Sequence, residues 1–225
     1  MDFKENTVAI IIAAGEATRW GNHLGVAKHF VPIDGTPILE RTVSQLNRHD
    51  IKPYIVANTD EYDLPGARLY KPTHQPLNHD ADKFLNSEDL WNTFGRTIVL
   101  YGDVFFTDEA MSTIVEHKGE DWVLFGRRGP NRFTGTEAGE CFAQSFYPKD
   151  LGDHRTALKY IAMLKRNNKI IRCGGWEHYR AMEGLPIDPL KGNPKGERFI
   201  KIDDWTNDFD FPADYEAFVN AWEKK

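Results

Sequence analysis

Apolar residues in this sequence fall into two kinds of segment, short β-branched runs and longer stretches with helical spacing. The first run, residues 8–13 (VAIIIA), ends at a glycine turn, which is typical of a fully buried strand. Comparable runs predict further strands at residues 53–57, 97–101, 121–125 and 141–147.

Helical spacing recurs between these runs. Thr36 and Pro37 are a suitable N-cap and first residue for a helix that carries Ile38, Leu39, Val43 and Leu46. The clearest helix is the last one, where four large apolar residues recur at i, i+3, i+4 and i+7: Tyr215, Phe218, Val219 and Trp222. We also expect helices at residues 80–91, 108–117 and 155–166.

Alternation of strands with helices predicts an α/β fold: a Rossmann-like three-layer sandwich with a mostly parallel sheet covered on both faces. No repeat, low-complexity tract or long linker divides the chain, so we expect a single domain over residues 1–225. Two Gly-rich and Pro-rich stretches, residues 126–139 and 184–196, are expected to be loops near the ligand side of the sheet.

Composition narrows the class of protein without indicating its chemistry. The 225 residues are 40% hydrophobic, with a formal net charge of −6, which argues against a surface for nucleic acid. The longest apolar run is too short to span a bilayer and the N-terminus does not have the pattern of a secretory signal, so we expect no membrane partner. The two cysteines favour idle thiols in a reducing cytoplasm.

The segment after the first strand carries the chemistry. The turn Ala13-Ala14-Gly15 consists of small residues, so backbone N–H groups can approach phosphate oxygens closely. Arg19 and Lys28 follow, and fixed cations there would offset the charge that develops on a leaving pyrophosphate. The G-x-G-x-x-G pattern of dinucleotide sites and the P-loop pattern are both absent.

This segment resembles the nucleotidyltransferases of the glycosyltransferase-A-like fold, which include sugar-phosphate, phosphocholine and molybdopterin nucleotidyltransferases. Their signature is roughly A-A-G-x-G-T-R, then a lysine, then a P-I-x-G-x-P-L-like stretch. The chain has Ala13-Ala14-Gly15, Thr18-Arg19, Lys28 and residues 32–38 (PIDGTPI) in that order. Ala17 replaces the second glycine, a change that would cost about 1 kcal/mol if its φ were positive.

The resemblance implies transfer of a nucleoside monophosphate from an NTP to a phosphorylated small-molecule acceptor, a sugar phosphate or phospho-alcohol, with release of pyrophosphate. It implies catalytic roles for Arg19, Lys28 and Asp103. The residues that it places around the nucleotide phosphates are Ala13, Ala14, Gly15, Ala17 and Thr18.

Two acidic segments fit a divalent cation, Mg²⁺ or Mn²⁺. Asp103 follows the strand at residues 97–101, at the sheet edge where open α/β folds bind ligands. Asp208 and Asp210 lie two residues apart and therefore share a face of an extended segment. In the family that the chain resembles, the first aspartate holds the metal, and one of the other two would supply a second hard oxygen ligand. Helix capping by Asp210 and solvation of Asp208 are the competing interpretations.

Recognition of the base and of the acceptor is less constrained. Relatives read the base between the loop and the metal aspartate, which makes Asp82, Asn86 and Ser87 candidates and favours a pyrimidine NTP, with CTP first. Ordinary polarity of a helix surface explains the same residues. For the acceptor phosphate we expect Arg127, Arg128 and Lys201, although solvated side chains are the competing interpretation.

We therefore expect an in-line attack of the acceptor phosphate on the α-phosphorus, which needs no protein base because the phosphate is already ionised. Two alternatives remain open at this point. One is a metal-dependent glycosyltransferase that takes a nucleotide-sugar through Asp208-Phe209-Asp210, and the other is a non-catalytic nucleotide-binding module. Relatives are often dimers, so a homodimer is also an expectation.

Overall fold

The computed structural model describes residues 6–15, 18–73, 79–136, 138–187 and 196–225. Its strands are β1 (Thr7–Ile12), β2 (Pro32–Ile33), β3 (Thr36–Pro37), β4 (Tyr54–Val56), β5 (Arg68–Tyr70), β6 (Arg96–Tyr101), β7 (Val104–Phe105), β8 (Val123–Arg127), β9 (Glu140–Phe146), β10 (Phe199–Lys201) and β11 (Asn207–Asp208). Its α-helices are α1 (Ile38–Arg48), α2 (Asp80–Leu85), α3 (Asp108–Val115), α4 (Leu151–Arg166), α5 (Gly175–Met182) and α6 (Pro212–Trp222).

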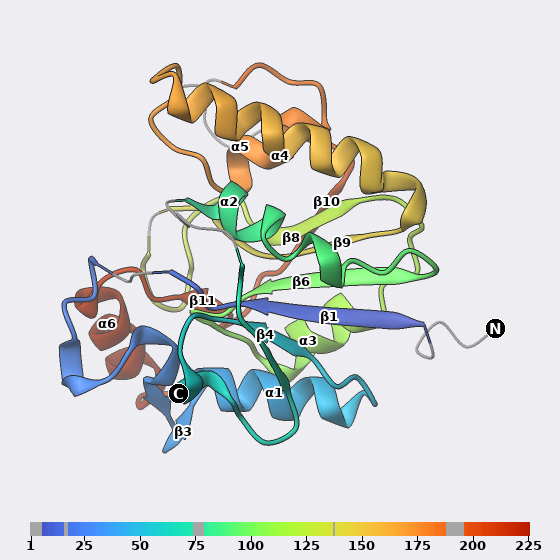
Figure 1. Cartoon of the computed structure of the whole chain (residues 1–225). Coiled ribbons are helices and arrows are strands. Elements are labelled where there is room, and N and C mark those ends of the chain that lie inside the picture. Colours follow the sequence, from blue (N-terminus) through green and yellow to red (C-terminus); the bar gives the residue numbers. More distant parts are fainter. Residues whose placement is uncertain (1–5, 16–17, 74–78, 137, 188–195) are drawn as a thin grey trace.

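Seven strands form one sheet in the order β10-β8-β9-β6-β1-β4-β5 (Figure 1). Every neighbouring pair is parallel except the two that involve β9, which runs antiparallel to β6 and to β8. The predicted mostly parallel sheet is therefore confirmed. Since the carboxyl ends of parallel strands meet at one edge, the segments after β1, β4 and β6 converge there.

Helices cover both faces of the sheet, and β1 shows how the sequence divides them. Ala9 and Ile11 belong to the hydrophobic cluster shared with α1 and α3, while Ile10 and Ile12 belong to the cluster shared with α2, α4 and α5. All four side chains are buried because successive residues of a strand point to opposite faces. This strand therefore reads as a continuous apolar run, as expected for a central parallel strand.

A third hydrophobic cluster fixes the C-terminal helix. Phe209, Tyr215 and Phe218 pack with Trp20 and Ile33, so α6 covers the segment that follows the first strand. The Tyr215 hydroxyl also donates a hydrogen bond to the carbonyl oxygen of Pro32 at 2.9 Å. Antiparallel pairing of β11 with β7 places Asp208 opposite Val104. The last quarter of the chain thus returns to the edge of the sheet where β1 and β6 end.

Several elements differ from the expected ones. The helix expected at residues 80–91 ends at Leu85 and is followed by a short 3-10 turn, Glu88–Leu90. Ser87, between them, donates both its backbone N–H, at 3.0 Å, and its hydroxyl, at 2.7 Å, to the Phe84 carbonyl. Helix α4 begins four residues before the expected start. No helix among the described residues is long and apolar enough to cross a membrane.

Candidate functional site

The turn after β1 lies directly beside the end of β6. The backbone N–H of Gly102 donates to the carbonyl of Ile12 at 2.9 Å. A Cβ on Gly102 would lie 2.8 Å from that oxygen and 3.1 Å from the Cβ of Ala13, so only glycine allows this approach. Ala13 and Ala14 are buried and Gly15 is half-buried. Asp103 is thereby placed next to the predicted phosphate turn, while Ala17 lies outside the described residues.

Lys28 is the buried cation of this site. It lies in a 3-10 turn (Lys28–Phe30), and its ammonium donates a hydrogen bond to the carboxylate of Asp103. Its Nζ also lies 3.7 Å from an Oδ atom of Asp210. Burial alone would lower the pKa of Lys28, but the negative charges of Asp103, Asp210 and Asp208 raise it. Burial likewise opposes ionisation of Asp103, yet Lys28 holds the pKa of that carboxyl at about 2.

Arg19 approaches the same group from the exposed side. Its guanidinium donates to Asp210 at 2.7 Å and lies over the ring of Phe211, 5.2 Å from the centroid. Thr18, beside it, is exposed. Two residues at opposite ends of the chain are thus in contact. The pair is half-exposed, so it contributes little to stability and leaves the guanidinium accessible to a ligand.

The site also contains a half-buried carboxyl group that the sequence did not indicate, that of Glu140 at the start of β9. Burial raises the pKa of Glu140 to about 7. The negative charges of Asp210 and Asp103 contribute to this rise, and the positive charge of Arg127 opposes it. Burial also raises the pKa of Asp208 well above its usual range, and the surrounding carboxylates raise it further. Asp103, Asp208, Asp210 and Glu140 therefore form one electrostatically coupled group of acids.

A second residue that the sequence analysis missed is Lys83 on α2. Its Nζ lies 3.3 Å from where a Cβ on Gly15 would be, and it also pairs with Asp80 at 3.1 Å. The positive charge of Lys83 acts on Asp103 as well, where it helps to lower the pKa of the carboxyl. Its helical position carried no signal, because only the packing of α2 against the turn brings this lysine to Gly15.

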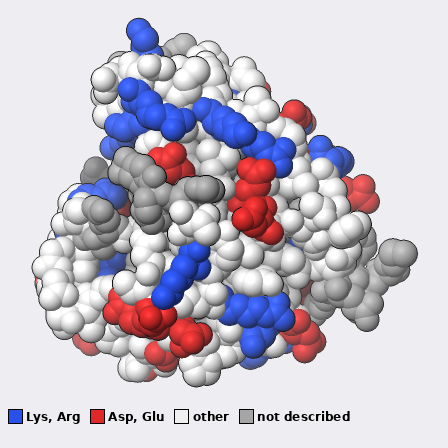
Figure 2. Space-filling model, in the orientation of Figure 1, with Lys and Arg blue, Asp and Glu red and all other residues white. Residues whose placement is uncertain are grey.

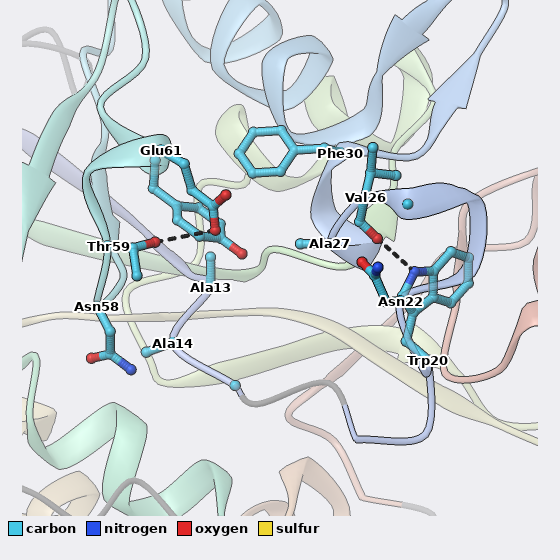
Figure 3. Close-up of a pocket in the computed structure, with 13 residues that line it drawn as sticks. Ala13, Ala14, Trp20, Asn22, Val26, Ala27, Phe30, Asn58, Thr59 and Glu61 are labelled. Carbon is cyan, nitrogen blue, oxygen red and sulfur yellow. Dashed lines mark hydrogen bonds between the residues drawn. The ribbon is translucent and has the colours of Figure 1, made fainter.

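A pocket of about 640 Å³ opens beside the turn Ala13-Ala14-Gly15, whose residues line it (Figure 3). One wall is the segment after β4, where Thr59 donates to Glu61 at 3.1 Å, and the opposite wall includes Trp20, whose indole donates to the Val26 carbonyl at 2.9 Å. The residues that line it are Ala13, Ala14, Gly15, Trp20, Asn22, Gly25, Val26, Ala27, Phe30, Asn58, Thr59, Glu61 and Tyr62. Aromatic faces and a few polar groups make it suitable for a flat polar ring.

The residues expected to read the base do not line this pocket. The carboxylate of Asp82 lies 3.3 Å from Nε2 of His79, and its backbone carbonyl accepts a hydrogen bond from Asn86 at 2.8 Å. Ser87 is completely buried. Among the described residues, the polar groups at the pocket come instead from Asn22 and residues 58–62, for which the sequence predicted no role.

Of the three residues expected to bind the acceptor phosphate, Arg127 instead holds neighbouring segments of the chain together. It is buried, and its guanidinium donates to the carbonyls of Gly129 and Thr206 at 3.0 and 3.1 Å and to the side chain of Asn207 at 3.1 Å. These bonds hold the strand that carries Asp208. Arg128 lies over the ring of Phe199 at 4.1 Å and donates to the Gly196 carbonyl at 3.0 Å. Lys201 is exposed and pairs with Asp203 at 2.8 Å.

Replacement of Arg127 by methionine is therefore expected to destabilise the protein by about 2–4 kcal/mol, because it removes the donor to the buried Thr206 carbonyl and one of the two donors to the Asn207 side chain. Urea unfolding followed by circular dichroism measures this. Arg132→Met is the matched control, since Arg132 is exposed and its change is expected to stay within about 0.5 kcal/mol. Equal stability of the two variants would contradict the structural role of Arg127.

Residues 9–84 match the family model of the MobA-like NTP transferase domain. The matched segment contains the turn after β1, Arg19, Lys28 and the pocket residues, so the predicted resemblance is confirmed for this part of the chain. A search of curated protein sequences gives no significant match.

Solved structures resemble the whole chain. One is the CTP:phosphocholine cytidylyltransferase of Streptococcus pneumoniae, with 13% identity, a TM-score of 0.59 and coverage of 96% of this chain and 99% of that one. Another is the inositol-1-phosphate CTP transferase of T. maritima, with 15% identity, a TM-score of 0.59 and coverage of 97% and 96%. At such low identity these similarities establish the shared fold, and the fold prediction is confirmed over nearly the full length.

Proposed function

We propose that the protein is a metal-dependent nucleotidyltransferase that transfers a nucleoside monophosphate from an NTP, with CTP favoured, to a phosphorylated small-molecule acceptor and releases pyrophosphate. The observation that carries the proposal is the contact of Lys28 with Asp103 beside the turn Ala13-Ala14-Gly15, inside the segment that matches an NTP transferase domain. The fold neighbours named for CTP act on phosphocholine and inositol-1-phosphate, which supports an acceptor of this chemical class.

The coupled acids fit a divalent cation. The pKa values of Asp208 and Asp210 are raised by burial first and by the neighbouring carboxylates second, and a bound Mg²⁺ or Mn²⁺ would favour the ionised forms. No group of three or more His, Cys, Asp or Glu residues in the described part of the chain is arranged to hold a metal by itself. Mg²⁺ is usually held by one or two carboxylates together with substrate phosphates. Asp103 and either Asp208 or Asp210 would hold the ion, which would supply charge stabilisation at the phosphates.

The protein groups have distinct parts in the proposed reaction. An oxygen of the acceptor phosphate forms a bond to the α-phosphorus of the NTP, and the bond from that phosphorus to the bridging oxygen of the β-phosphate breaks. Backbone N–H groups of the turn and the ammonium of Lys28 neutralise the phosphates, while Arg19 reaches the leaving pyrophosphate from outside. Lys83 adds a cation beside Gly15. The base occupies the pocket between Phe30, Tyr62 and Asn58.

The first experiment is thermal melting with each of the four NTPs, with and without Mg²⁺, because a ligand that binds the native state raises the melting temperature. A shift with one NTP, followed by pyrophosphate release with phosphocholine, inositol-1-phosphate or a sugar phosphate, is the expected result. A shift with a nucleotide-sugar alone would indicate the glycosyltransferase. NTP binding without pyrophosphate release from any acceptor would indicate a non-catalytic module.

Arg19→Gln separates a role in the reaction from a role in folding. Its pair with Asp210 is half-exposed, so we expect the free energy of unfolding to change by less than about 1 kcal/mol. Loss of its charge at the leaving group is expected to lower kcat/KM for pyrophosphate release by about 10²-fold. Arg48→Gln, which removes a similarly exposed pair with Asp108, is the control. Equal activity of both variants would remove Arg19 from the proposed site.

A further inference from the structure

The segment formed by α4 and the turn after it has a charge opposite to that of the whole chain. Residues 154–173 contain six lysines and arginines and no aspartate or glutamate, in a protein with a net charge of −6. Figure 2 shows these cations as a stripe along the upper edge of the molecule, where α4 lies in Figure 1. A local concentration of this kind attracts anions despite the acidic total charge.

The helix turns most of these cations outward. Leu158, Ile161 and Ala162 are buried against α2 and α5, whereas Lys159 and Arg166 are exposed on the opposite side. The turn after the helix continues the exposed basic surface with Lys169 and Arg172. Lys165 donates to the Ile171 carbonyl at 2.7 Å and so ties this turn to the end of α4. We call Lys159, Tyr160, Met163, Arg166, Lys169, Ile171 and Arg172 the α4 face.

Large apolar side chains lie exposed among these cations. Ile171 is 79% exposed, and Tyr160 and Met163 are 47% and 45% exposed, which places them among the most exposed large apolar residues that the structure describes. Tyr160 and Met163 are three residues apart and therefore adjacent on the helix surface. Exposed apolar side chains cost free energy in water, and a group of them with a basic border is the pattern of a surface that meets a partner.

We propose that the α4 face is a peripheral docking surface for an anionic lipid bilayer. Lysine and arginine attract the negatively charged headgroups, while Ile171, Met163 and Tyr160 enter the boundary between headgroups and acyl chains. Long cationic side chains suit this position because their ammonium and guanidinium groups stay at the headgroups while their stems lie along apolar surface. The contact is on the surface of the bilayer and requires no spanning segment.

The apolar residues favour a lipid over a nucleic acid. Phosphate contacts with DNA or RNA need the cations alone, and bases are bound by aromatic stacking or by hydrogen bonds. Ile171 and Met163 provide neither, and both would remain in water on a nucleic-acid duplex. A bilayer removes their apolar surface from water at the same time as it neutralises the charge. Lipid binding by the α4 face is independent of the proposed function, so the test does not depend on turnover.

The test is sedimentation of the full chain with vesicles of phosphatidylcholine alone and of phosphatidylcholine with one-third phosphatidylglycerol. Binding to the anionic vesicles only, weakened by added salt, is the expected result. Reversal of three exposed cations, Lys159→Glu, Lys169→Glu and Arg172→Glu together, is expected to weaken binding at least about 30-fold. Met163→Ser with Ile171→Ser, which keeps every charge, is expected to weaken it about tenfold.

The matched control reverses the charge of three exposed lysines elsewhere, Lys52, Lys118 and Lys224. It is expected to leave binding to the anionic vesicles nearly unchanged. Melting temperatures verify that each variant is folded. No binding to anionic vesicles, or equal loss in the control and the α4 variants, would overturn the proposal. Binding to a DNA duplex would also overturn the proposal if it were as tight as binding to vesicles and were not weakened by the Met163 and Ile171 changes. That result would show that the α4 face binds polyanions in general.

Discussion

Replacing Asp103 by asparagine is expected to lower the rate of pyrophosphate release by at least about 10³-fold and to leave the protein folded. Asparagine keeps the size of the side chain but removes the negative charge that pairs with Lys28 and that would hold the cation. A proposed metal ligand therefore becomes a neutral amide. The measurement is kcat for pyrophosphate release at saturating NTP and Mg²⁺.

Folding should survive because two effects of the Asp103 change oppose each other. The buried ammonium of Lys28 loses a charged partner, which destabilises the native state by about 1–3 kcal/mol. Asp208 and Glu140 lose a neighbouring negative charge that raises their pKa values, so repulsion within the group of acids decreases. We therefore expect a melting temperature within a few degrees of that of the unmodified protein.

Asp121→Asn is the matched control for this experiment, because Asp121 is an exposed aspartate that pairs with Lys149 at 2.6 Å, outside the site. It is expected to retain full activity. The Asp103 variant should also lose the Mg²⁺-dependent part of the stabilisation by NTP. Turnover by the Asp103 variant within about tenfold of the unmodified protein would contradict both its metal role and its catalytic role.

The second large effect is a loss of stability in acid, which we expect from two buried histidines outside the candidate site. His154 and His178 are buried with ring centroids 4.8 Å apart, and their four ring nitrogens have no hydrogen-bond partner among the described residues. Burial lowers the pKa of His178 to about 3. Burial, with the neighbouring His178 and Arg155, also lowers the pKa of His154 well below its usual range.

The direction of the pH effect follows from these shifts. In the unfolded chain both histidines bind a proton below a pH of about 6.5, whereas the native protein keeps them neutral. The unfolded state therefore takes up more protons, and stability falls as the pH decreases below 6.5. Each histidine contributes a loss of about 1.4 kcal/mol per pH unit until its native pKa is reached. Together the two histidines are expected to lower the free energy of unfolding by several kcal/mol between about pH 6.5 and pH 5.

His178→Phe is expected to reduce the slope of stability against pH by about half of this contribution, and His154→Phe to do the same. The readout is the difference in unfolding free energy between pH 7.5 and pH 5 from urea titrations. The slope is informative because the larger ring changes packing equally at every pH. His49→Gln, at the half-exposed end of α1, is the control. Unchanged slopes in both core variants would show that these histidines are not buried neutral.

Local patterns in the sequence were sufficient to predict the layers of the fold and the first half of the site. The run 8–13 is apolar at every position because β1 is covered on both faces, and a central parallel strand has few other solutions. The turn and Asp103 follow β1 and β6 directly, so their meeting at one sheet edge was predictable, whereas Lys28 lies in a later 3-10 turn and was a candidate only through the family resemblance. Segments that follow parallel strands meet at the same edge of a sheet, whatever the rest of the chain does.

The remaining residues depend on contacts between distant segments. Glu140 begins a strand that runs antiparallel between β6 and β8, and no local pattern indicates that the charge of Asp210 would act on its half-buried carboxyl. Arg127 resembled an exposed arginine at a loop, but pairing with Asn207 gives it a buried structural role. Ser87 resembled a helix-surface residue, but the helix ends at Leu85 and the hydroxyl turns back to the Phe84 carbonyl.

The sequence by itself therefore determined the sheet and the turn of small residues after β1, because strand and turn preferences act over a few neighbouring positions. Only the tertiary structure decided which charges meet. Arg19 and Asp210 are 191 positions apart, and the β7–β11 pairing with the packing of α6 brings them to 2.7 Å. A buried charge must find its partner within a few ångströms, and that distance is set by the packing of the whole core.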